Sequence, residues 1–143
     1  MTQLKVTESQ LHKTVADLLD WMLLPPALWT TFPAGWGKLP KATAGRLYGA
    51  GLKAGFPDIQ IFFNGRCTML ELKAPGGALS KVQRQRILLL RGAGVMTYVC
   101  HNPEEVISAL RAASCTLQDR NCRGNRCIAI FGVSVRSKSD FTW

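Results

Sequence analysis

The stretch Gly55–Lys73, with the sequence GFPDIQIFFNGRCTMLELK, predicts a β-hairpin at the centre of the fold. Its two halves, Asp58–Phe63 and Cys67–Leu72, are runs of strand-forming residues on either side of Asn64-Gly65. Asn-Gly between two such runs is the strongest short turn signal, because both residues tolerate the left-handed backbone that a two-residue loop requires. We therefore expect two adjacent antiparallel strands joined by a tight turn.

The length of this turn determines which residues face each other across the hairpin. A two-residue loop pairs Phe63 with Arg66, and counting back along both strands places Asp58 opposite Glu71. Because side chains alternate between the two faces of a strand, Lys73 falls on the same face as Glu71. The sequence thus predicts two carboxylates and a lysine on one strand face.

Two acids in this position indicate a metal site. Directly opposed side chains have Cβ atoms roughly 4.5 to 5.5 Å apart, so two carboxylates repel each other unless a cation lies between them. Oxygen ligands of this kind suit Mg²⁺ or Mn²⁺. A lysine beside such a metal can orient or deprotonate a water and neutralise charge on a phosphoryl group. This chemistry is typical of phosphodiester hydrolysis.

A simpler interpretation of the same residues stays open. The hairpin face could carry an ordinary surface Glu and Lys, with Pro57-Asp58 merely opening a strand. Asp and Glu-x-Lys at this spacing also occur by chance.

The charge balance favours a polyanionic partner. Eighteen Lys and Arg against nine Asp and Glu give a formal net charge of +9 and a sequence pI of about 9.8. A basic surface around an acidic pocket attracts phosphates while the pocket holds metal. The positive charges are dispersed, so a disordered nucleic-acid-binding arm is not indicated.

The 143 residues, 47% of them hydrophobic, suit one domain with a real core. No apolar stretch approaches the roughly 20 residues of a membrane span and the N-terminus lacks a signal-peptide core, so we expect a cytoplasmic protein without membrane contact. Five cysteines without a Cys-x-x-Cys pair predict reduced thiols. An alternative is a zinc site built from Cys115, Cys122, Cys127 and His101.

The remaining pattern surrounds the hairpin with helices and strands. Thr7–Gln10 is a capping box that opens an amphipathic helix to about Leu24, where Pro25-Pro26 ends it. The other expected elements are a strand at 27–32, a loop to 40, a glycine-weakened helix at 41–53, a helix from Ser80-Lys81 to Arg91, a strand at 95–100 and a helix at 103–113. In the third helix, Leu88, Leu89 and Leu90 indicate a buried face. Strands covered by helices make an α/β layered domain.

At this point several ordered motifs together resemble the VRR-NUC domain, a branch of the PD-(D/E)xK nuclease superfamily whose short stand-alone members occur in bacteriophages. They are Gly51-x-x-x-Gly55-Phe56-Pro57-Asp58, the stretch Leu70–Gln83 with the sequence LELKAPGGALSKVQ, a helix ending at Gly94, and a strand running into Asn102–Glu105. The resemblance implies a restriction-endonuclease-like mixed central sheet flanked by helices, with an αβββαβ core. It assigns residues 1–113 to the nuclease domain and leaves 114–143 as an extension of unknown role.

The resemblance also implies an Mg²⁺- or Mn²⁺-dependent endonuclease and a set of site residues. The implied metal ligands are Glu8, Asp58, Glu71 and the Leu72 carbonyl, and the implied catalytic residues are Asp58, Glu71, Lys73 and Gln83. The family's loop after the first strand often carries an Asn-Gly-Gly-Lys-Arg type of sequence, whereas this chain has PAGWGK at 33–38.

Two of these residues have structural alternatives. Glu8 lies in the first turn of its helix, where an acid is favoured by the helix dipole alone. Gln83 falls three positions after Ser80, where it could serve only as the capping-box partner.

Basic and aromatic residues provide candidate nucleic-acid contacts. The expected contacts are Lys38, Arg46, Lys53, Lys81 and Arg84. Lys81, Arg84 and Arg86 either grip phosphates or form a solvated face. Trp29 and Trp36 either stack on unpaired bases or pack in the core or a dimer contact.

Three functions remain open at this stage: a nuclease that cuts branched or flapped DNA such as a Holliday junction, a DNA-binding module that does not cut, and an RNA-processing nuclease of the same fold. The intact Asp58, Glu71 and Lys73 favour cutting. His12 and His101 are isolated, so a histidine general base has little support. A symmetrically cut junction requires two sites, which predicts a homodimer whose interface could involve Trp21–Leu24 or 128–135.

Overall fold

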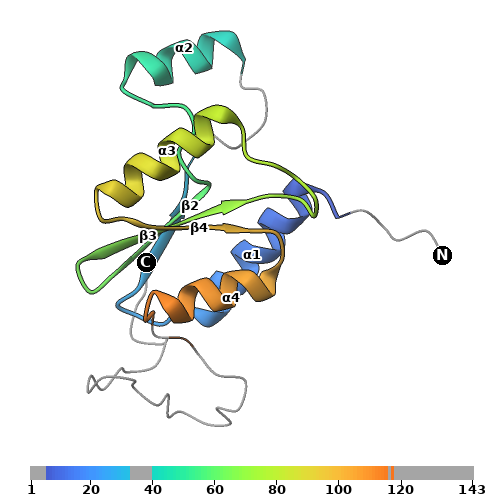
Figure 1. The fold of residues 1–143 in the computed structure, drawn as a ribbon, viewed down its shortest axis with the longest axis vertical. Helices are drawn as coiled ribbons and strands as arrows, with labels where there is room; N and C mark the ends of the chain where they lie inside the picture. The colour runs from blue at the N-terminus through green and yellow to red at the C-terminus, as the bar shows by residue number, and fades with distance from the viewer. Residues whose placement is uncertain (1–5, 33–39, 116, 118–143) are drawn as a thin grey trace, which may run out of the picture.

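The computed structural model describes residues 6–32, 40–115 and 117 (Figure 1). The elements in chain order are α1 Glu8–Met22, β1 Leu28–Thr31, α2 Lys41–Gly49, β2 Ile59–Phe63, β3 Arg66–Leu72, α3 Lys81–Gly92, β4 Met96–Cys100 and α4 Pro103–Ala112. This order confirms the predicted αβββαβ core, with α2 inserted between β1 and β2 and α4 added after β4. Every expected element of the core exists, with ends that differ from the prediction by one or two residues.

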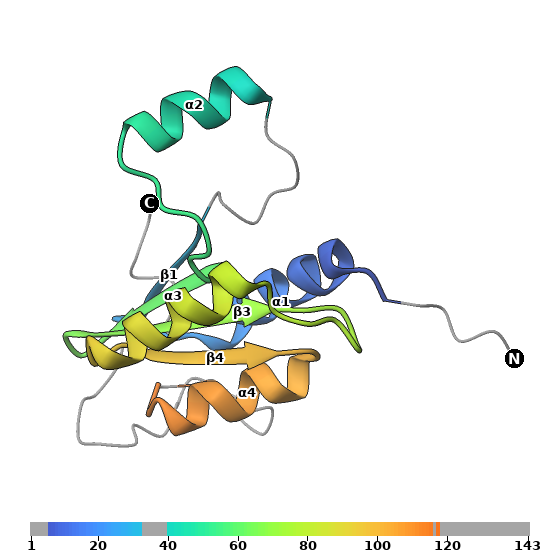
Figure 2. The same ribbon diagram turned by 45° about the horizontal axis from the view of Figure 1, so that its top comes forward.

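The four strands form one mixed sheet in the order β1-β2-β3-β4. Strand β2 pairs antiparallel with both β1 and β3, whereas β4 runs parallel to β3. Helix α3 covers one face of this sheet, and α1 and α4 cover the other (Figures 1 and 2). The fold is therefore the mixed α/β layered sheet that the sequence predicted.

The central hairpin has the predicted register. Phe63 pairs with Arg66 and Ile59 with Leu70, so the next pair along the same register sets Asp58 opposite Glu71. Asn64 and Gly65 have φ values of 49° and 69°. Positive φ at both loop residues matches the twist of the flanking strands, which is why Asn-Gly is favoured there.

The hydrophobic core lies almost entirely between the sheet and the α1–α4 pair. Apolar positions at helical spacing on α1 and α4 meet alternate residues of β2 and β3. The core members include Leu11, Val15, Leu19, Ile59, Ile61, Leu70, Leu72, Val106 and Leu110. Because Leu70 and Leu72 face this core, alternation turns Glu71 to the opposite face, toward α3.

Helix α1 begins with the predicted capping box between Thr7 and Gln10. It ends at Met22 instead of Leu24, and the residues that follow turn into the protein. Met22, Leu23 and Leu24 are buried, so the proposal that they form an exposed interface is wrong; only Trp21 of that cluster is exposed. The physical reason is that the chain turns inward after α1, so these three side chains are covered by the protein, and Leu23 packs in the hydrophobic core.

Helix α3 corrects a second expectation. Of its residues, all of which the structure describes, one is buried, namely Ile87. Leu88 and Leu89 do not mark a buried face, because they are 67% and 63% exposed. Consecutive leucines point about 100° apart on a helix, so a single apolar contact line can bury one of them and leave its neighbours in solvent.

Helix α2 stands away from the rest of the domain in both views (Figures 1 and 2). It ends at Gly49, earlier than the expected Lys53, and none of its residues is buried. Gly45 and Gly49 weaken the helix, which is consistent with its shortness.

Trp29 packs against the core, and its indole N–H donates to Asp20 Oδ1 at 2.9 Å, which supports the packing interpretation. Within the described part of the chain, no helix has both the length and the apolarity that crossing a membrane requires. Trp36, Lys38, Cys122, Cys127 and the segment 128–135 lie outside the described residues.

Candidate active site

Asp58 and Glu71 meet on the face of the hairpin that is turned away from the main core. Both side chains are buried, and Glu71 has 0% of its surface exposed. Asp58 Oδ2 accepts a hydrogen bond of 2.8 Å from the backbone N–H of Leu72. This bond ties the residue that precedes β2 to the end of β3 and holds the two carboxylates side by side.

Lys73 is the cation nearest to these acids. Its Nζ lies 2.8 Å from Glu71 Oε1 and 3.5 Å from Glu8 Oε1. The Lys73 backbone N–H donates to the carbonyl of Cys100, so β4 extends the sheet pairing up to this residue. The structure therefore brings Glu8, Glu71 and Lys73 together, although Glu8 is 65 residues from Lys73 in the chain.

Gln83 carries out two tasks at the N-terminus of α3. Its Oε1 accepts a hydrogen bond of 2.9 Å from the Ser80 backbone N–H, and Ser80 Oγ accepts one from the Gln83 N–H, which completes a capping box. Its Nε2 donates to Glu71 Oε1. Gln83 is thus both the capping-box partner of Ser80, through Oε1, and a hydrogen-bond donor to the Glu71 carboxylate, through Nε2. The two interpretations of Gln83 that the sequence left open are therefore compatible.

Burial dominates the electrostatics of the two acids. Burial raises the pKa of Asp58, although the Leu72 N–H and the charge of Lys73 act in the opposite direction. Burial, followed by the charge of Asp58, raises the pKa of Glu71 to about 7 from an ordinary value of 4.5. Two carboxylates in one buried place cannot easily both ionise, which is the condition that a bound cation relieves.

The ammonium group of Lys73 is kept charged by its neighbours. Burial acts to lower the pKa of Lys73, but the contact with Glu71 and the charges of Glu8 and Asp58 outweigh it, and the net pKa is raised. Lys73 is therefore protonated at neutral pH in this arrangement. It is suited to donate hydrogen bonds and neutralise negative charge.

One carboxylate oxygen of the site has no partner. Glu71 Oε2 is buried and accepts no hydrogen bond from the described residues. Buried polar atoms normally have a hydrogen-bond partner. A buried carboxylate oxygen without such a partner, next to a second carboxylate, is suited to bind a cation. Within the described residues no group of three or more His, Cys, Asp or Glu side chains is arranged to hold a metal ion. Asp58 and Glu71 would hold such an ion, with the Leu72 carbonyl, water and substrate oxygens as the kinds of ligand that would complete its shell. Glu8, the third acid of the implied ligand set, contacts Lys73.

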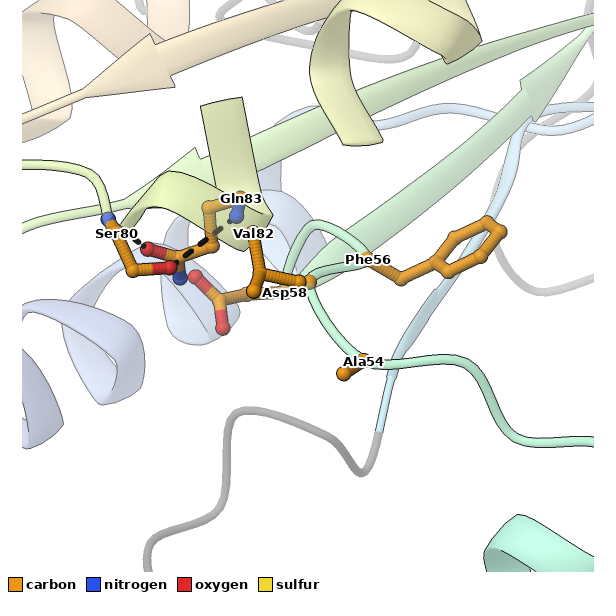
Figure 3. A pocket seen from close by; sticks show the side chains of 7 residues that line it. Ala54, Phe56, Asp58, Ser80, Val82 and Gln83 are labelled. Atoms are coloured by element: carbon orange, nitrogen blue, oxygen red, sulfur yellow. Dashed lines mark hydrogen bonds between the residues drawn. The ribbon is translucent and has the colours of Figure 1, made fainter. Parts of the chain in front are cut away.

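A cavity of about 270 Å³ opens beside Asp58 (Figure 3). Its wall joins the segment before β2 to the first turn of α3, and Figure 3 shows Asp58, Ser80 and Gln83 gathered on one side, with the Phe56 ring pointing away from them. The lining residues are Ala54, Gly55, Phe56, Asp58, Ser80, Val82 and Gln83. A Cβ on Gly55, whose φ is 78°, would come within 2.9 Å of the Val82 carbonyl oxygen, so a glycine is required where this segment meets α3.

His12 belongs to the neighbourhood of the site, which the sequence interpretation missed. It lies one turn after Glu8 on α1, and its electrostatic interaction with Asp58 acts to lower the pKa of that carboxyl group. Its Nε2 is buried and has no hydrogen-bond partner among the described residues. The signal that could have identified it is the four-residue spacing from Glu8, because such pairs share one helix face.

The predicted nucleic-acid contacts are dispersed over two helices and the segment between them. Arg46, Lys53, Lys81 and Arg84 are all exposed. Arg84 donates to the Leu79 carbonyl at 2.6 Å, which keeps its side chain at the N-terminal end of α3.

Comparisons with known proteins agree with this fold. The model of the VRR-NUC domain family matches residues 6–103, more than half of the chain. A solved structure described as a VRR_NUC domain protein superposes with a TM-score of 0.52 at 22% sequence identity, covering 76% of this chain and 88% of that chain. No curated protein matches the chain.

The matched family is a branch of the PD-(D/E)xK nuclease superfamily. Within that superfamily, the chain belongs to the VRR-NUC family. Nucleases of this type typically use divalent metals.

Proposed function

We propose that this protein is a Mg²⁺- or Mn²⁺-dependent endonuclease that hydrolyses phosphodiester bonds in structured DNA of the branched or flapped type. The observation that carries the proposal is the buried Asp58–Glu71 pair with an unpartnered oxygen on Glu71 and Lys73 at 2.8 Å. A structural hairpin gains nothing from two mutually repelling buried acids, whereas a metal site requires them.

Each residue has a defined task in this proposal. A divalent metal bound by Asp58 and Glu71 would supply Lewis-acid chemistry to the phosphoryl group and its attacking water. Gln83 holds Glu71 Oε1 and so orients the other carboxylate oxygen. Lys73, protonated for the reasons above, neutralises negative charge that develops on the phosphoryl oxygens. Glu8 helps to hold the Lys73 ammonium in place.

The charge distribution supports nucleic acid as the substrate. The segment that runs from α2 to the end of α3 carries one acid apart from Asp58, namely Glu71, and both are in the site. The basic residues of α2, α3 and the segment after α2 are Lys41, Arg46, Lys53, Lys81, Arg84, Arg86 and Arg91. By contrast, α1 and α4 carry Glu8, Asp17, Asp20, Glu104 and Glu105 against Lys13 and Arg111. A polyanion is therefore attracted to the α3 side of the sheet.

Substrate shape and assembly are further parts of the proposal, and family resemblance supports them. Symmetric cutting of a four-way junction needs two sites related by a two-fold axis, so a homodimer accompanies that substrate. A flap needs one site, and a monomer suffices for it. DNA is preferred over RNA on family resemblance, since a site directed at the backbone recognises phosphate in both.

The test is a cleavage assay with labelled duplex, flap, four-way-junction and RNA substrates in Mg²⁺, Mn²⁺ or EDTA. We expect cutting of branched DNA with either metal, none in EDTA, and none by Asp58→Asn, because losing one ligand charge weakens metal binding. Glu104→Gln is the matched control, since it removes one carboxylate from the exposed surface of α4. Wild-type rates for Asp58→Asn at saturating Mn²⁺ would refute the site assignment. Selective binding of branched DNA without cutting under any metal would indicate a binding module.

A further inference from the structure

Helix α3 presents apolar side chains to solvent on the face turned away from the sheet. Leu88 and Leu89 are the two most exposed of the large hydrophobic residues in the described part of the chain, at 67% and 63%, and Val82 is about half exposed. Leu89 lies seven residues after Val82, and Leu88 lies four residues after Arg84, so the apolar side chains alternate with basic ones along the helix. We call Lys81, Arg84, Leu88 and Leu89 the outer face of α3; Val82 adjoins it and also lines the cavity beside Asp58.

The charge of this face decides what can cover it. Helix α3 carries Lys81, Arg84, Arg86 and Arg91 and no acid, and the chain has no Asp or Glu between Glu71 and Glu104. A second copy packed on the same face through a two-fold axis would place these cations against their own equivalents. A polyanion meets no such repulsion, so charge complementarity favours nucleic acid as the occupant.

The position of the outer face relative to the site also favours nucleic acid. Gln83, in the first turn of α3, donates to Glu71 of the active site. Leu88 follows Gln83 by five residues, which is about 7.5 Å along a helix axis at the usual rise of 1.5 Å per residue. This distance corresponds to roughly two base steps of about 3.4 Å. Five residues also rotate the helix by about 140° beyond a full turn, so Leu88 lies on the side of α3 away from Gln83. DNA that reaches both the site and the leucines therefore passes around the exposed first turn of α3, which carries Lys81 and Arg84.

Leucine side chains gain little from the phosphates and sugars that an intact duplex presents. Faces of unstacked bases are apolar and are exposed where stacking is interrupted, as at a branch, nick or flap. We propose that the outer face of α3 binds DNA at such an interruption, with Lys81 and Arg84 on phosphates and Leu88 and Leu89 against unstacked bases. This inference rests on the proposed function, because it names the DNA feature that the same site selects.

The test compares binding of flap, four-way-junction and fully paired DNA by fluorescence anisotropy in Ca²⁺, with the double variant Leu88→Gln plus Leu89→Gln. Both side chains are exposed, so the variant is expected to keep the thermal stability of the wild type. We expect its affinity for flap and junction DNA to fall about tenfold and its affinity for duplex to change less than twofold. The matched control is Leu28→Gln plus Phe62→Gln, an exposed cross-strand pair on β1 and β2 that should bind like the wild type.

Equal losses on duplex and branched DNA, or no loss on either, would overturn the proposal. Unchanged affinity together with a smaller particle in light scattering would also overturn it and would assign the outer face to a protein contact. The result is independent of catalysis. If the wild type cuts no substrate but the leucine variant loses branch-selective binding, the nuclease assignment fails and this inference stands. If the wild type cuts branched DNA and the leucine variant binds it normally, this inference fails and the nuclease assignment stands.

Discussion

Gln83 Nε2 donates a hydrogen bond to Glu71 Oε1 while the other end of the same amide caps helix α3. The first turn of α3 and the end of β3 are thereby fastened by one side chain. The stability of α3 and the orientation of the Glu71 carboxylate are consequently coupled. Experiment can separate the two effects, because the chain contains a second capping box of the same kind, between Thr7 and Gln10.

Gln83→Ala should lower both stability and metal affinity. Loss of the hydrogen bond from the Ser80 N–H to the Gln83 side chain should cost about 0.5–1.5 kcal/mol, while Ser80 Oγ keeps its bond to the backbone N–H of residue 83. The concentration of Mg²⁺ that gives half-maximal cutting should rise by about 10- to 100-fold because Glu71 loses its orienting partner. Thermal melting and metal titration measure the two effects. Gln10→Ala is the control, since Gln10 completes the capping box of α1 without a contact to Glu71. Equal metal requirements in the two variants would show that the Gln83–Glu71 bond has no part in metal binding.

Lys73→Met should abolish turnover and preserve DNA binding. In the proposed function, Lys73 neutralises charge that is greatest in the transition state, so its loss should affect the chemical step more than the ground state. Met keeps the length of the buried stem. Gel-shift affinity in Ca²⁺ is expected to stay within about threefold of the wild type. Binding that is tenfold weaker, with a normal rate at saturation, would make Lys73 a phosphate contact only.

Stability in metal-free buffer should fall as the pH rises from about 4.5 to 7. Glu71 has a pKa of about 7 in the folded protein against an ordinary 4.5, and the pKa of Asp58 is raised as well. A carboxyl group with a raised pKa binds its proton more tightly in the folded state than in the unfolded state. Its contribution to the free energy of unfolding is therefore fully present below the pKa of the unfolded state, and it is lost as the pH rises through the pKa of the folded state. The raised pKa of Lys73 changes stability only at alkaline pH, and the lowered pKa of Glu105 changes it only below about pH 4.5.

The expected loss between pH 5 and 7.5 in EDTA is on the order of 1–3 kcal/mol, measured by thermal or urea unfolding. Saturating Mn²⁺ should remove most of this loss, because a metal that binds only the folded state stabilises it. Asp58→Asn should show a shallower dependence, since the charge of Asp58 is the second cause of the raised pKa of Glu71. Stability that rises steadily over this interval in EDTA would contradict the buried pair of acids.

Lys81→Ala combined with Arg84→Ala should reduce the salt dependence of DNA binding. Each lost phosphate contact lowers the slope of log affinity against log salt by about one unit, so a reduction of about two is expected with duplex and branched DNA alike. Lys13→Ala on α1 is the control, because Lys13 lies outside the α2–α3 region and pairs with Asp17. An unchanged slope in the double variant would show that the DNA phosphates do not contact Lys81 and Arg84 in the first turn of α3.

The sequence specified the hairpin and its two acids because these depend on local rules. Asn64-Gly65 determines the turn, the turn determines the register, and alternation then places Asp58, Glu71 and Lys73. Capping boxes at Thr7 and Ser80 were equally readable, since each involves residues three positions apart.

Long-range packing was not readable in the same way. Whether Leu23 or Leu89 is buried depends on which elements lie beside it, and the two residues have opposite outcomes. The proximity of His12 to Asp58 likewise follows from how α1 docks on the sheet. The segment 128–135 lies outside the described residues, and its proposed part in a homodimer stays a prediction.

The two layers of this domain are held by different forces. Helices α1 and α4 are attached by an apolar core, whereas α3 buries only Ile87 among its residues and adds polar contacts such as Arg91 to the Thr97 carbonyl and Gln83 to Glu71. Detaching α3 therefore exposes little apolar surface, so its opening has a small dependence on denaturant and heat capacity and can occur below the global unfolding free energy. The amide protons of α3 should exchange with solvent before those of α1. The wall that α3 contributes to the cavity beside Asp58 is therefore expected to open before the α1 layer does.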